Sequence, residues 1–97
     1  MRQFDIVEFP DRALALLLQA DLLDDTLTRV VAPLVRANSL KPTARLHPEI
    51  RVGRHEYVVL FDQLAAVPRS EIGRSVMSAR DREWEFRRAL DLVFVGV

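Results

Sequence analysis

Short apolar runs, separated by polar or proline-containing stretches, fill most of the chain before its last twenty residues. Runs of about four to eight residues that are rich in β-branched and aromatic side chains predict strands. We expect strands in residues 4–9, 14–18, 29–35, 49–52 and 57–61, and a further apolar run, 64–67, ends at Pro68. Residues 14–18 could also form a short helix, but their length favours a strand. Gly53-Arg54, between the fourth and fifth runs, predicts the turn of a hairpin.

Three stretches modify this pattern. Pro33 lies inside the run 29–35, and because proline cannot donate to a sheet ladder, it predicts an edge strand or a bulge there. Residues 21–28 are polar and acidic apart from three leucines, so we expect a loop with an apolar tip. Residues 70–76 predict a short turn or a helical segment.

Residues 78–94 contain neither proline nor glycine and predict a C-terminal helix. Ser78 can cap its start, and Asp81 would lie near the positive end of the helix dipole. Apolar residues spaced by four, three and four predict the side that packs on the core: Phe86, Leu90, Val93 and Val97. The opposite side carries Trp84, Arg88, Asp91 and Val95. A tryptophan and a valine on that side need an explanation other than core packing.

The composition fits one globular domain spanning residues 1–97, since 49% of the 97 residues are apolar and 29% are charged. So short a chain has a modest core, which a dimer would extend. Fourteen basic and fourteen acidic residues cancel, so no net charge favours direct nucleic-acid or membrane binding. We expect a cytoplasmic protein, because no apolar run is long enough to span a membrane and the acidic N-terminal region does not fit a signal peptide.

The candidate chemistry is sparse. The absence of cysteine excludes disulfides, thiolate metal sites and cysteine nucleophiles, and we expect neither metal nor cofactor. His47 and His55 are expected to be solvated loop residues. Asp21, Asp24 and Asp25 lack the glycine and spacing of a calcium loop, which favours a solvated acidic loop. Arginines interleave with acidic residues along the C-terminal segment and predict an ion-paired helix surface: Arg80, Arg82, Arg87 and Arg88.

Several short motifs, taken in order, resemble the CcdB-type toxins of bacterial type II toxin–antitoxin modules, which share a fold superfamily with MazF. They are Leu46-His47-Pro48, Ile50-Arg51-Val52-Gly53, Ala66-Val67-Pro68, Ile72-Gly73-Arg74, Arg82-Glu83 and the terminal run 89–97. The first half matches more loosely. No single motif is specific, but their joint order, spacing and total length are.

The resemblance implies a mainly β, α+β fold: a small antiparallel SH3-like barrel with a C-terminal helix, assembled as a twofold dimer. It implies a toxin that binds the A subunit of DNA gyrase and poisons this topoisomerase. It also implies a cognate CcdA-like antitoxin that neutralises the toxin, with roles in plasmid maintenance and transcriptional autoregulation. The family's toxins make and break no bond, so we expect a binding protein and not an enzyme.

The gyrase-contacting positions that the resemblance implies are Leu22, Leu23, Asp91, Phe94, Val95, Gly96 and Val97. Trp84 and Arg88 are possible additional partner contacts. The chain departs from the toxic members at two positions, where they carry a tryptophan in place of Val95 and a neutral amide in place of Asp91. Two alternatives therefore stand beside gyrase poisoning: a retargeted or decayed member that binds only an antitoxin, and a MazF-like endoribonuclease.

Overall fold

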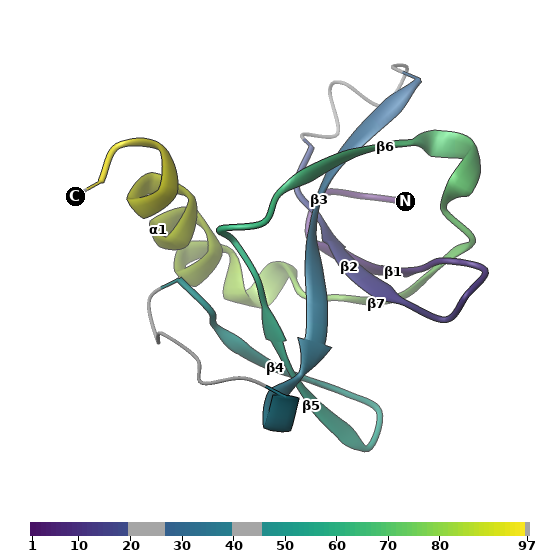
Figure 1. Cartoon of the computed structure of the whole chain (residues 1–97), viewed down its shortest axis with the longest axis horizontal. Helices are drawn as coiled ribbons and strands as arrows, with labels where there is room; N and C mark the ends of the chain where they lie inside the picture. Colours follow the sequence, from purple (N-terminus) through teal and green to yellow (C-terminus); the bar gives the residue numbers. More distant parts are fainter. Residues whose placement is uncertain (20–26, 40–45, 97) are drawn as a thin grey trace.

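The computed structural model describes residues 1–19, 27–39 and 46–96, which form an antiparallel sheet curled into a half-barrel with one helix at the C-terminal end (Figure 1). The strands are β1 (Asp5–Glu8), β2 (Leu14–Leu17), β3 (Thr28–Arg36), β4 (Glu49–Val52), β5 (His55–Val59), β6 (Ala65–Pro68) and β7 (Arg74–Ser78). The helix α1 spans Glu83–Phe94. The predicted α+β fold, mainly β with a terminal helix, is confirmed.

The long strand β3 lies at the centre of the sheet, whose order is β4-β5-β3-β2-β1-β7 with β6 also paired to β3. One side of β3 pairs with β2; the other side pairs with β6 over residues 28–31 and with β5 over residues 34–36. Pro33 is therefore not on an edge strand, but the ladder is irregular there, because the register shifts between the Val31–Ala65 and Leu34–Val59 pairs. At Pro33 the strand that pairs with this side of β3 changes from β6 to β5. Pro33 has no N–H to donate to the Leu60 carbonyl opposite it, and that carbonyl accepts a hydrogen bond from the Gln63 N–H.

The predicted hairpin is confirmed, with β4 and β5 joined by the two-residue turn Gly53-Arg54. Gly53 has a φ of 61°, a left-handed conformation that costs little only for glycine. Positive φ at the first central residue is a feature of the two-residue turns that match the twist of paired strands.

Two predicted boundaries are wrong. Residues 70–76 contain a 3₁₀ turn, Arg69–Glu71, and then the start of edge strand β7, which pairs with β1. The helix also starts later than Ser78, because the Ala79 N–H donates to the Phe4 carbonyl and so continues the sheet contacts. The Ser78 hydroxyl accepts from the Arg80 N–H, and a 3₁₀ turn, Arg80–Arg82, precedes α1.

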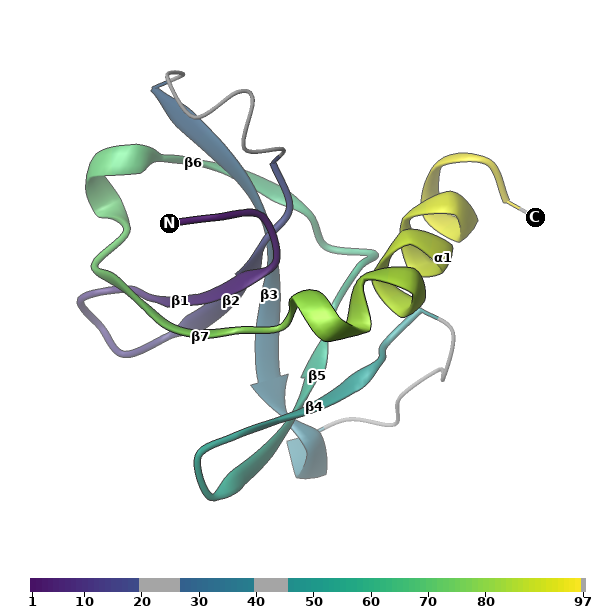
Figure 2. The same ribbon diagram turned by 180° about the vertical axis from the view of Figure 1, so that it is seen from behind.

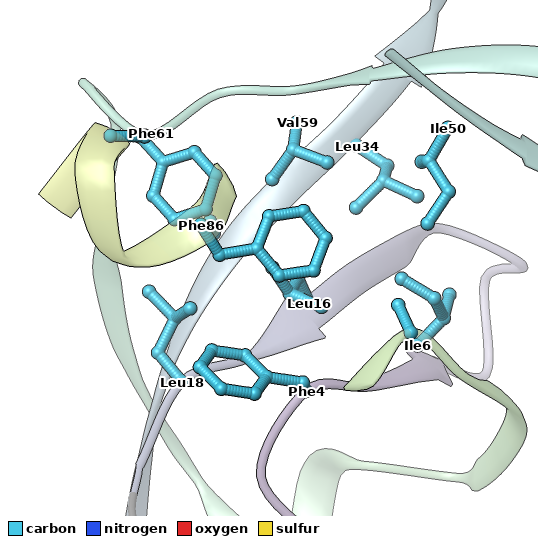
Figure 3. Packing of buried hydrophobic residues seen from close by; sticks show 12 residues of the cluster. Phe4, Ile6, Leu16, Leu18, Leu34, Ile50, Val59, Phe61 and Phe86 are labelled. Atoms are coloured by element: carbon cyan, nitrogen blue, oxygen red, sulfur yellow. The ribbon is translucent and has the colours of Figure 1, made fainter. Parts of the chain in front are cut away.

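The main core lies between the curled sheet and α1 (Figure 3). Phe86 of α1 is fully buried, with ring centroids 5.6 Å from Phe4 and 5.8 Å from Phe61. A smaller buried cluster contains Val7, Ala15, Leu17, Val31 and Ile72. Both views of the ribbon place α1 at one end of the molecule, after β7 and the short turn that follows it (Figures 1 and 2). One side of α1 therefore closes the core and the other is left for contacts.

Candidate functional site

The inner side of α1 is fixed by core packing. Phe86 and Ala89 are buried, and Leu90 and Val93 are half-buried against the same cluster. The predicted core-facing stripe is thus confirmed for Phe86, Leu90 and Val93. Its fourth member, Val97, lies outside the described residues. This packing sets which side chains of the helix point away from the protein.

The outer side of α1 presents large apolar side chains to solvent. Trp84 is 80% exposed, Phe94 71% and Val95 69%. Single exposed apolar residues are ordinary on protein surfaces, but three large ones along a twelve-residue helix and its end form a candidate interaction surface. The prediction that Trp84 and Val95 face away from the core is confirmed.

The charges on α1 and on the turn before it divide into paired and unpaired groups. Arg82 pairs with Glu85 at 2.6 Å and Arg87 with Glu83 at 2.7 Å, as the interleaved sequence predicts. Arg88 and Asp91 are exposed and form no ion pair with any described residue. The carboxylate of Asp91 stands in the last turn, near the negative end of the helix dipole, which is the unfavourable end for an anion.

The end of α1 has a defined backbone geometry. Gly96 adopts a φ of 79° and donates its N–H to the Leu92 carbonyl, which is the left-handed closure common at helix C-termini. The Val95 N–H donates to the Asp91 carbonyl. These bonds hold the backbone at Phe94 and Val95 while their side chains remain in solvent. A fixed backbone reduces the entropy that a bound partner would have to remove.

The predicted contact residues fall into three groups. Asp91, Phe94, Val95 and Gly96 come together at the end of α1, all exposed. Trp84 lies about 16 Å from Val95 along the helix axis, at 1.5 Å per residue, and Arg88 lies between them. The remaining predicted contacts, Leu22, Leu23 and Val97, lie outside the described residues, as do the acidic residues of the 21–25 segment.

His47 corrects one expectation. Its side chain is only 12% exposed, and its Nε2 lies 2.9 Å from Oδ1 of Asp62. The β4–β5 pairing brings these residues together, because the Val59 N–H donates to Pro48 and the Phe61 N–H to Leu46. Sequence reasoning missed this pair, since its members lie fifteen positions apart in the chain. His55, at the start of β5, is exposed.

Two other classes of site are missing from the described part of the chain. No three histidine, aspartate or glutamate side chains gather there in a way that could hold a metal ion. No helix within the described ranges has the length and apolarity that a membrane crossing requires. The outer side of α1 and the His47–Asp62 pair are two candidates for a functional site among the described residues.

The family model described as CcdB protein matches residues 3–96 of the chain. The chain belongs to the CcdB family of toxin–antitoxin toxins. The match covers both the strand-rich part and α1, so the resemblance seen in the separate motifs extends over nearly the whole chain.

Solved structures of toxins share the fold. The Mycobacterium tuberculosis toxin MazF-mt6 is 17% identical with a TM-score of 0.78, and the match covers 97% of each chain. An endoribonuclease solved in complex with its cognate antitoxin, from a mycobacterial species, is 12% identical with a TM-score of 0.79, over 100% of this chain and 96% of that one. A second mycobacterial endoribonuclease has a TM-score of 0.75 at 14% identity, over 100% of this chain and 92% of that one.

These neighbours overturn the expectation that the chain is not an enzyme. Proteins described as endoribonucleases have the same fold over almost their full length, so this architecture supports RNA cleavage as well as the non-enzymatic binding typical of the CcdB family. At identities below 20% the neighbours share the fold alone, and a role for any single residue needs its own argument.

Proposed function

We propose that the chain is a toxin that binds the DNA gyrase A subunit through the end of α1 and is neutralised by a cognate antitoxin. One observation carries the proposal: in a chain of the CcdB family, Phe94 and Val95 are exposed at a helix end whose backbone is fixed by Gly96. Exposed apolar side chains on a fixed backbone favour binding, because little entropy is lost when the partner covers them. An antitoxin that covers the same helix end would block the toxin.

Val95 sets the expected strength of gyrase binding. Family members that poison gyrase carry a tryptophan at this position, and replacing an aromatic anchor by valine costs about 2 kcal/mol or more. Asp91 adds a charge that must be desolvated unless the partner supplies a cation. We therefore expect gyrase binding that is weaker than in members with the tryptophan.

The test is Val95→Trp, measured as binding to the dimerisation region of the gyrase A subunit together with a thermal melt. Binding should strengthen by about 1 to 3 kcal/mol, the scale of an aromatic hot spot. The melting temperature should hardly change, because Val95 is exposed. Arg54→Trp places the same indole on the distant β4–β5 turn and should leave binding unchanged.

Several results would contradict this proposal. Unfolding of Val95→Trp would mean that the position is buried in the functional protein. Strong poisoning by the wild type that Val95→Trp does not change would place the hot spot elsewhere. Antitoxin binding without gyrase binding in either form would favour a retargeted or decayed member.

The second candidate function is endoribonuclease activity, which the shared fold and the His47–Asp62 pair favour. A carboxylate that holds one ring nitrogen of a histidine can fix its tautomer and support proton transfer at a reacting hydroxyl. A ribonuclease that uses the 2′-hydroxyl as nucleophile needs a base of this kind. His47 is the candidate for that base, with Asp62 as the group that orients its ring.

Incubation with structured and single-stranded RNA tests this function. Site-specific cleavage that is lost in His47→Gln and kept in His55→Gln would establish a catalytic role for the pair, since His55 is exposed and lies outside it. Cleavage that survives His47→Gln would place the catalytic groups elsewhere. Intact RNA in every reaction would leave gyrase binding as the better explanation.

A further inference from the structure

The outer side of α1 has a chemical symmetry along its length. Trp84, Arg88, Asp91 and Val95, hereafter the outer stripe, are spaced by four, three and four residues. At about 100° per residue they lie within about 60° of one another around the helix axis. Read from the two ends, the stripe runs apolar, charged, charged, apolar, and its two charges are opposite in sign.

We propose that the outer stripe pairs with the same stripe of a second copy, with the two helices antiparallel. In this arrangement Trp84 of each copy faces Val95 of the other, and Arg88 of each faces Asp91 of the other. The twofold axis crosses the helix pair at the level midway between residues 89 and 90. The same contacts are therefore made by both copies, as an isologous interface requires. Spacings of four and three residues are those at which two helices keep a seam in contact.

Charge complementarity supports this occupant. Arg88 and Asp91 are exposed and pair neither with each other nor with any other described residue, although they are three residues apart on one helix. Across an antiparallel pair each gains an opposite charge. The carboxylate of Asp91 also comes beside the first half of the neighbouring helix, away from that helix's negative end.

The stripe differs from the sheet-mediated dimer that the family resemblance implies, and its size indicates a modest affinity. It extends over about 16 Å of a single helix, which is small beside stable interfaces that bury about 800 Å² on each partner. Pairing would cover Val95 and Asp91, so any partner that binds the end of α1 would compete with the second copy. Self-association would then regulate access to the helix end.

The test uses two charge reversals, Arg88→Glu and Asp91→Arg, in the full chain. Each variant alone places like charges opposite one another at both contacts. Association through the outer stripe, measured by sedimentation equilibrium as association beyond any sheet-mediated dimer, should weaken roughly tenfold or more. A mixture of the two variants should regain association as a heterodimer. In this heterodimer the introduced glutamate at position 88 of one variant would face the introduced arginine at position 91 of the other. At the second contact the native Asp91 would face the native Arg88. The double variant, Arg88→Glu with Asp91→Arg, should regain association alone.

The mixing result separates this pairing from other forms of dimer. Arg54→Glu, on the β4–β5 turn, makes the same charge change away from the stripe and should associate like the wild type. Because the chain has no cysteine, Arg88→Cys with Asp91→Cys provides a second readout: oxidation should link two copies covalently. Unchanged association in both single variants, or no recovery on mixing, would overturn the proposal, whatever the outcome of the gyrase and RNA assays.

Discussion

Two phenylalanines of α1 show how position decides the role of a residue. Phe86 is fully buried between Phe4 and Phe61, whereas Phe94 is 71% exposed two turns later. Both are equally hydrophobic in isolation. The difference arises because only Phe86 falls on the side of the helix that faces the curled sheet, so one residue stabilises the fold and the other is available to a partner.

We predict that Phe86→Ala destabilises the protein by about 3 to 5 kcal/mol, because it removes a buried ring and leaves a cavity between two other aromatic side chains. Phe94→Ala is the matched control and should change stability by less than about 0.5 kcal/mol. Urea unfolding followed by circular dichroism measures both. Equal losses in the two variants would contradict the assignment of inner and outer sides.

At the scale of elements, β7 depends on a close approach between two backbones. Gly73 donates its N–H to the Glu8 carbonyl at 2.9 Å, just before β7 pairs with β1. A Cβ at Gly73 would lie 2.7 Å from that carbonyl oxygen, closer than atoms of this kind approach. The glycine is therefore required by the neighbouring strand and not by its own backbone angles.

We predict that Gly73→Ala costs about 1 to 3 kcal/mol of stability, because the new methyl group must displace backbone atoms of β1. Hydrogen exchange should quicken at the amides that join β1 and β7. Gly53→Ala is the comparison, since its site is sterically open but has a positive φ, and there faster exchange should be confined to the β4–β5 hairpin. Unchanged exchange at β1 and β7 in Gly73→Ala would show that the close approach is not maintained in solution.

At the scale of the whole molecule, one helix both completes the core and provides the outer stripe. The chain is small, and a chain of this size leaves much of its apolar surface within reach of solvent. Trp84, Phe94 and Val95 are the large hydrophobic side chains that remain exposed on α1 and its end. Contact with a second copy or a target would cover this surface, which is a reason to expect association.

We predict a homodimer in solution, with a mass of about twice 11.1 kDa at micromolar concentration. The physical reason is the small core together with the sheet-mediated dimer that the family resemblance implies. Sedimentation equilibrium measures this mass, and dilution shows how tight the association is. A monomer at every concentration in this range would contradict the prediction. The exposed side of α1 would then need a partner other than a second copy.

Local sequence determined most of the strands and which side of α1 faces the core. The β4–β5 hairpin, its glycine turn and the inner and outer sides of the helix follow from residues a few positions apart, whose periodicity fixes which side can be apolar. The exposure of Asp91, Phe94, Val95 and Gly96 agrees with this pattern, while their part in binding gyrase stays a prediction. The family was also visible, because order and spacing of motifs survive where single residues change.

Tertiary structure alone decided the features that join distant residues. The change of neighbour that accommodates Pro33, the backbone approach at Gly73 and the His47–Asp62 pair depend on which strands lie side by side. Edge strand β7 was missed for the same reason, since its polar residues are held by pairing with β1 and not by an apolar pattern of their own. Propensity and periodicity act over a few residues, whereas strand pairing is selected by the free energy of the whole packed core.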